Sequence, residues 1–142
     1  MAEQIIIMPS IIIGLVIGIY EAILLHRDVT VPTHRFGHMA HALVFAIAAT
    51  FAAMNVPFVL SVIPQLQSVP LLNNVLIFRI AIGLIAILKI HGASAAIRGT
   101  IGGSSVGMAE TWTHSLIIGT MIVVAPYVYP AVAPLLPVWA QR

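Results

Sequence analysis

The 142-residue chain is 61% hydrophobic and only 7% charged, whereas soluble domains carry roughly 25% charged residues. This composition excludes an ordinary soluble domain and predicts an all-α integral membrane protein in the cell membrane. The net charge of +2 comes from six basic and four acidic side chains, which is too sparse for a nucleic-acid-binding surface. The chain has no cysteine, which excludes disulfides, thiolate metal sites and covalently attached haem.

Hydrophobic stretches separated by short polar or glycine-rich connections predict four membrane-spanning helices, since each span needs about 20 residues. The predicted spans are residues 5–25, 34–60, 71–92 and 108–129. They leave room for a single domain, residues 1–142, folded as a small four-helix transmembrane bundle in contact with the lipid bilayer.

The first two spans carry signals for packing and for a break. Gly14 and Gly18 form a G-x-x-x-G face, which lets a neighbouring helix backbone approach closely. In the second span, Pro57 and Pro64 predict that the helix ends or kinks there, because proline lacks the donor for the helix hydrogen bond.

The third span contains Arg79, which the predicted boundaries place close to the middle. A guanidinium at that depth needs a partner or water, so we expect an ion pair or a partner contact. Glu21 is the nearest plausible acid within the chain, and a carboxylate of another subunit or a lipid headgroup is the alternative. After this span, glycines at four-residue spacing predict tight helix packing: Gly99, Gly103 and Gly107.

The fourth span is followed by a tail with prolines at residues 126, 130, 134 and 137. This spacing discourages a regular helix and predicts an extended segment at the membrane interface. Asn55, Asn73 and Asn74 are candidate hydrogen-bonding groups at the same end of the bundle.

Basic residues set the predicted orientation. Four of them lie in or near the first and third connections, whereas the N-terminus and the second connection have none: Arg27, Arg35, Lys89 and Arg98. By the positive-inside rule, these connections face the cytoplasm and both termini face away from it.

Four spans place all six histidines at the cytoplasmic end of the bundle. The spacing of His34, His38 and His41 puts them along one helical face, and Glu110 and His114 share another. A site built from carboxylates and imidazoles of three helices suits a transition metal such as Zn, Cu or Fe: Glu21, His38, His41, Glu110 and His114. The alternative is that these histidines are interface residues, which we expect for His26 and His34.

Three functions remain open. The first is a small structural or accessory subunit of a larger membrane complex, with other membrane subunits or further copies of the chain as partners and no catalytic activity on its own. The second is a proton or metal-ion channel or transporter that uses the His/Glu cluster. The third is a redox protein with bound metal or haem.

As a short His-bearing four-span chain, the protein resembles the small subunits of membrane-bound copper monooxygenases, such as archaeal ammonia monooxygenase. The resemblance covers no specific motif and assigns no residues, but it favours the first function, an accessory subunit.

Overall fold

The computed structural model describes residues 3–28, 32–100 and 112–141, and it gives the backbone alone for residues 25–28, 32–36, 38 and 93–100. The described residues are helical and contain no strand. The helices are α1 (Met8–Asp28), α2 (Pro32–Met54), α3 (Val56–Val62), α4 (Val75–Thr100) and α5 (Trp112–Val132), with short 3-10 turns η1 (Pro64–Ser68), η2 (Ala133–Leu135) and η3 (Val138–Ala140).

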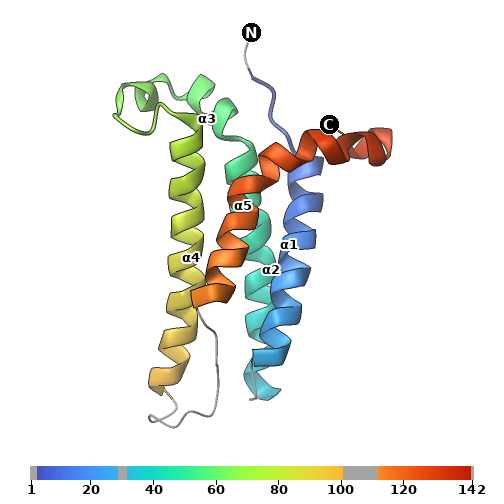
Figure 1. Ribbon diagram of the computed structural model, residues 1–142, viewed down its shortest axis with the longest axis vertical. Coiled ribbons are helices and arrows are strands. Elements are labelled where there is room, and N and C mark those ends of the chain that lie inside the picture. The colour runs from blue at the N-terminus through green and yellow to red at the C-terminus, as the bar shows by residue number, and fades with distance from the viewer. Residues whose placement is uncertain (1–2, 29–31, 101–111, 142) are drawn as a thin grey trace.

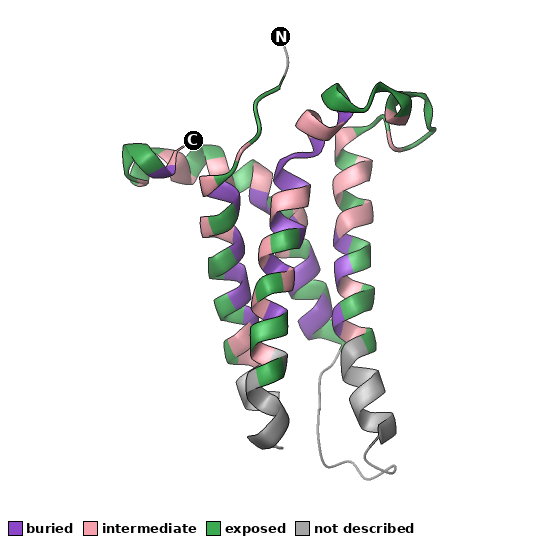
Figure 2. Cartoon of the chain, turned by 180° about the vertical axis from the view of Figure 1, so that it is seen from behind, coloured by how far each residue is buried: buried purple, intermediate pink, exposed green. Residues whose placement is uncertain are grey.

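Helices α1 and α2 run antiparallel and side by side, and α4 and α5 form a second antiparallel pair (Figure 1). The small core lies where the two pairs meet, and it is built from alanines and isoleucines such as Ala46, Ala86 and Ile118. The buried positions follow the inward faces of the helices, while the outward faces are exposed (Figure 2). Both ends of the described chain lie at the end of the bundle that also carries α3 (Figure 1).

Two helical segments in the described part are long and apolar enough to cross a membrane, Val75–Gly92 and Trp112–Leu135. A third candidate consists of two helices, Met39–Met54 and Val56–Val62, which are bent by 61° relative to each other. The apolar part of α1, Met8–Leu24, is shorter. The all-helical architecture with two to three candidate spans is consistent with a membrane protein.

The bend between α2 and α3 lies at the proline that predicts it. Pro57 has no N–H, so the carbonyl of Ala53, four residues earlier, cannot receive its helix hydrogen bond. Arg79 of α4 supplies the missing donor, with its Nε 3.0 Å from the Ala53 oxygen. Gln67 donates to the Leu60 carbonyl at 2.8 Å in the same way. Pro64, four residues after Leu60, also lacks the N–H that would donate to that carbonyl in a helix.

Asn55 is the residue between α2 and α3, and it connects the bend to the start of α1. Its side-chain oxygen accepts from the Ile6 N–H at 2.6 Å, and its amide donates to the Ile6 carbonyl at 2.9 Å. The same amide contacts Ser10 and the Phe51 carbonyl. Because Asn55 is only 3% exposed, these bonds also satisfy a polar group that would otherwise be costly to bury.

Each helix pair is held together at glycines. A Cβ added at Gly14 would lie 2.7 Å from the Ile47 Cα, and one at Gly18 would lie 3.0 Å from the Leu43 Cα. In the other pair, a Cβ at Gly83 would lie 3.2 Å from the Gly119 carbonyl oxygen. The absence of side chains therefore allows backbone to approach backbone in both pairs.

The prediction of an extended tail is wrong for its first part. Pro126 and Pro130 lie inside α5, which continues to Val132, and the tail beyond it consists of two helical turns, η2 and η3. The tail lies across the end of the bundle beside the start of α1 (Figure 1). Tyr129 Oη donates to the Gln141 carbonyl at 2.7 Å, which ties the tail to α5, and the Gln141 side-chain amide donates to the Leu136 carbonyl at 2.7 Å within the tail.

The helix boundaries also differ from the predicted spans at several other points. Helix α1 is Met8–Asp28 rather than 5–25, and α4 continues to Thr100 rather than ending at residue 92. Helix α4 begins at Val75 rather than residue 71, so Arg79 lies in its second turn and not in its middle. The segment 34–60 is divided at Asn55 into two helices. Residues 108–111, at the start of the fourth predicted span, lie outside the described part of the chain.

Replacing Gly14 with Ala tests the close approach of α1 to α2. The new methyl group would meet the backbone of Ile47, so we expect the free energy of unfolding in detergent to fall by about 1–3 kcal/mol. Gly92→Ala is the matched control, because nothing lies within 4 Å of a Cβ there and alanine is the better helix former. Equal effects of the two changes would contradict this packing.

Replacing Asn55 with Ala tests the connection between the bend and α1. We expect the Ile6 amide to exchange its hydrogen faster, and the free energy of unfolding to fall by about 1–3 kcal/mol, because buried bonds are lost. Hydrogen exchange read by mass spectrometry checks both. The control is Asn73→Ala, which changes an exposed asparagine. Unchanged exchange across residues 3–10 in the Asn55 variant would refute the role of Asn55.

Candidate functional site

The end of the bundle opposite the α2–α3 bend carries most of the predicted site residues. Glu21 lies on α1 and His114 on α5, and both side chains are buried, at 2% and 6% exposure. His41 lies on α2 and is exposed. We call this region, with His91 of α4, the histidine end.

The packing of the helices places these four residues at one level. Gly18 packs on Leu43, so in an antiparallel pair Glu21 lies level with His41 to within about one turn. The ring of His91 stacks on Trp112 with centroids 3.7 Å apart, which brings the start of α5, and therefore His114, to the level of His91. The structure thus gathers a carboxyl group and three imidazoles at one end.

A metal site requires side chains close enough to bind one ion, which is more than lying at the same height along the bundle. Among the described residues, no three His, Asp or Glu side chains lie close enough together to hold a metal ion. The predicted set also includes Glu110, which lies outside the described residues, and His38, of which only the backbone is described. The five-residue metal site therefore stays a prediction.

Only some of the glycines predicted to pack helices lie in the part of the chain whose contacts the structure describes. Gly14 and Gly18 lie in the contact between α1 and α2. Gly99 belongs to the last turn of α4, where the backbone alone is described, and Gly103 and Gly107 lie outside the described residues. Sequence reasoning missed Gly83 and Gly119, because neither has another glycine four residues away and the two form a close contact only after α4 and α5 pack.

Lys89 lies near the histidine end on the surface of α4. Its ammonium group is 4.0 Å from the centre of the Phe45 ring, a geometry that attracts a cation to the face of an aromatic ring. This contact joins α4 to α2 at the end where the predicted orientation places the cytoplasm.

Arg79 lies at the other end of the bundle. Besides its bond to the Ala53 carbonyl, its guanidinium carbon is 4.9 Å from the centre of the Tyr127 ring on α5. Its contacts in the described part of the chain are therefore a backbone carbonyl and an aromatic ring. Glu21, the acid proposed from sequence as its partner, lies at the histidine end. The sequence signal for this contact is Pro57, which lacks the N–H that would otherwise donate to the Ala53 carbonyl four residues earlier.

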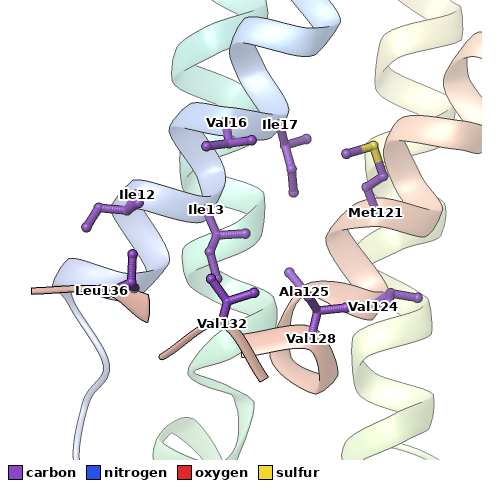
Figure 3. Close-up of a pocket in the computed structure, with 10 residues that line it drawn as sticks. All are labelled: Ile12, Ile13, Val16, Ile17, Met121, Val124, Ala125, Val128, Val132 and Leu136. Atoms are coloured by element: carbon purple, nitrogen blue, oxygen red, sulfur yellow. The ribbon is translucent and has the colours of Figure 1, made fainter. Parts of the chain in front are cut away.

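A third feature is an apolar hollow of about 360 Å³ between α1 and α5. Ile13 and Ile17 extend from α1 into the hollow opposite Met121 and Val128 of α5, Val16 lies on its wall, and the tail lies at one end of it (Figure 3). All ten lining residues are apolar.

The described residues thus provide buried proton-binding groups at one end, the hydrogen-bonded guanidinium of Arg79 at the other, and apolar surface between them.

Comparison of the chain with protein-family models, with curated proteins and with solved structures gives no match.

Proposed function

We propose that this chain is a small accessory subunit of a larger complex in the cell membrane. It crosses the membrane four times, with both termini on the non-cytoplasmic side. A metal-dependent complex, such as a membrane monooxygenase, is the class that fits its histidines and carboxylates, and the chain contributes structure to that complex rather than catalysis of its own.

The observation that carries this proposal is the open apolar hollow between α1 and α5. About 360 Å³ between these two helices opens to the outside and is filled by no side chain of the described residues, whereas the interior of a complete assembly is packed as densely as an organic crystal. The wall of the hollow includes Val16, which is 59% exposed. An apolar helix of a neighbouring subunit is the occupant that would complete this packing, since helices in membranes associate by van der Waals contact.

The low internal burial of the helices also supports a role within an assembly. Only 17% of Val75–Gly92 and 22% of Trp112–Leu135 is buried inside the chain. On α4, exposed side chains recur every four residues at Leu76, Ile80, Leu84 and Leu88, which forms an apolar stripe along the outward face. Such a helix presents most of its surface to lipid or to other subunits.

Filling the hollow tests the accessory-subunit proposal. We expect Val16→Trp to lower the amount of partner chain that co-purifies with the protein from native membranes by about tenfold, because the indole would occupy the space of the partner helix. The matched control is Val44→Trp, since Val44 is 67% exposed on α2 and does not line the hollow. The readout is the protein composition of the purified complex.

Two results would contradict the proposal. In the first, the unmodified chain is recovered from native membranes as a single, stable species without other chains. In the second, Val16→Trp and Val44→Trp retain the same amount of partner.

A second candidate function, proton or ion translocation, is favoured by the burial of Glu21 and His114 at one level. Ionisable groups inside membrane-spanning helices usually face a bundle interior and often belong to relays. Ser115, next to His114, is fully buried and adds a hydroxyl at this level. These groups are the kinds of side chain from which proton paths are built.

Glu21→Gln tests this candidate, because glutamine keeps the size of the side chain but does not ionise and so cannot take up and release a proton in a relay. For a relay, we expect most of the proton flux into liposomes to be lost in this variant, as read by a pH-sensitive dye inside the vesicles. Glu3→Gln is the control, since Glu3 is exposed ahead of α1. Equal flux in the two variants and the unmodified protein would eliminate the relay.

A further inference from the structure

We propose that the groove between α4 and α5 binds one phospholipid, with its phosphate at Arg79 and an acyl chain along the groove. This inference concerns a site separate from the hollow between α1 and α5 and does not depend on the accessory-subunit proposal.

Contacts with the protein hold the guanidinium of Arg79 in place but engage only some of its N–H donors. Its Nε donates to the Ala53 carbonyl and its guanidinium carbon lies 4.9 Å from the centre of the Tyr127 ring, which leaves the N–H groups of the two terminal nitrogens. In the part of the chain that the structure describes, Arg79 makes no further hydrogen bond and no ion pair. A guanidinium presents these donors as a fork that matches the oxygens of a phosphate.

The charge of Arg79 is not balanced by a nearby acid in the described residues. Glu21 and Asp28 lie in the later turns of α1, toward the histidine end. Glu3 is at the same end as Arg79 but is exposed and makes no ion pair. A cation within a membrane-spanning helix needs an anion or water, and no described acid supplies the anion, so an external anion is the partner that the proposal assigns to Arg79.

The position of Arg79 suits a lipid headgroup. It lies four residues after the start of α4 at Val75, which is about 6 Å along the helix axis. Side chains in a helix tilt toward its N-terminus, and here that direction is toward the near end of the candidate span Val75–Gly92. A long basic side chain at this depth reaches the membrane interface, where lipid phosphates lie.

The groove next to Arg79 suits the apolar part of the same lipid. It is a hollow of about 210 Å³ with walls that include Ile80, Leu84 and Val123. Gly83 and Gly119 form its floor, where an added Cβ would lie 2.3 Å from a neighbouring side chain. Arg79 precedes Ile80, and Tyr127 lies one turn beyond Val123, so the cation and its ring stand at one end of the groove.

A phospholipid combines one phosphate with long apolar chains, and the site combines one guanidinium with an apolar groove in the same order. A partner helix in this groove would need its own carboxylate opposite Arg79 in addition to an apolar face. The lipid accounts for both features with a molecule that every membrane supplies.

The test is a titration of the purified, delipidated full-length chain with phosphatidylglycerol in detergent, read by native mass spectrometry. We expect Arg79→Gln to weaken binding about fivefold or more. Lys89→Gln is the matched control, because Lys89 is also a cation of α4 that lies over an aromatic ring, and we expect no change in binding there. Circular dichroism establishes that each variant is folded.

A second variant keeps the test independent of any loss of stability at the bend. Thr120 is exposed and lines the groove, so we expect Thr120→Trp to fill the groove and weaken lipid binding while Arg79 and its bond to Ala53 stay intact. If Arg79→Gln fails to fold, the Thr120 variant decides the question.

Three results would overturn the proposal. Equal binding by the Arg79 or Thr120 variant and the unmodified protein is the first. The second is equal binding of diacylglycerol, which lacks the phosphate, or displacement of the lipid by an equal concentration of inorganic phosphate, which lacks the acyl chains. The third is an unchanged lipid titration in Arg79→Gln together with loss of a co-purifying protein chain, which would assign Arg79 to a subunit contact.

Discussion

The carbonyl of Ala53 is the group on which the arrangement of this chain depends. Pro57 removes its helix donor, and a buried carbonyl without a partner costs about 1–3 kcal/mol. Arg79 resolves that deficit from α4, which ties the second helix pair to the bend in the first. Asn55, two residues later, ties the start of α1 to the same place. One proline thus determines where three segments of the chain meet.

This constraint divides the molecule into two chemically different ends. At the bend, Asn55 and Arg79 form hydrogen bonds with backbone atoms, and the guanidinium of Arg79 also lies over the Tyr127 ring of α5. At the histidine end, Glu21 and His114 are buried. Among the described residues, they do not form a cluster that could hold a metal ion. Between the ends, the helices pack through glycine and alanine and leave apolar surface uncovered. We interpret the first end as a lipid contact and the uncovered surface as the place where larger subunits attach.

Much of the fold can be predicted from sequence, because hydrophobic length and proline position act locally. The helical class, the break at Pro57 and the close-packing glycines of α1 are of this kind. The tail was mispredicted because a proline removes one hydrogen bond but leaves the helical backbone dihedral available, so α5 continues through Pro126 and Pro130. The partners of Arg79 and the contact of Gly83 with Gly119 depend on how the two pairs of helices approach each other, which no local pattern contains. The metal ligands remain predicted, since Glu110 and the side chain of His38 lie outside the described residues.

The central claim is that this chain works as one part of a larger membrane assembly. Cross-linking followed by mass spectrometry in native membranes tests it most directly, with photoreactive groups placed at Val16 on the wall of the hollow and at Val44, which is exposed on α2 and does not line the hollow. The account predicts that Val16 cross-links to a helix of one defined neighbouring chain and that Val44 does not. Cross-links from Val16 only to lipid, with no other protein attached, would contradict the claim.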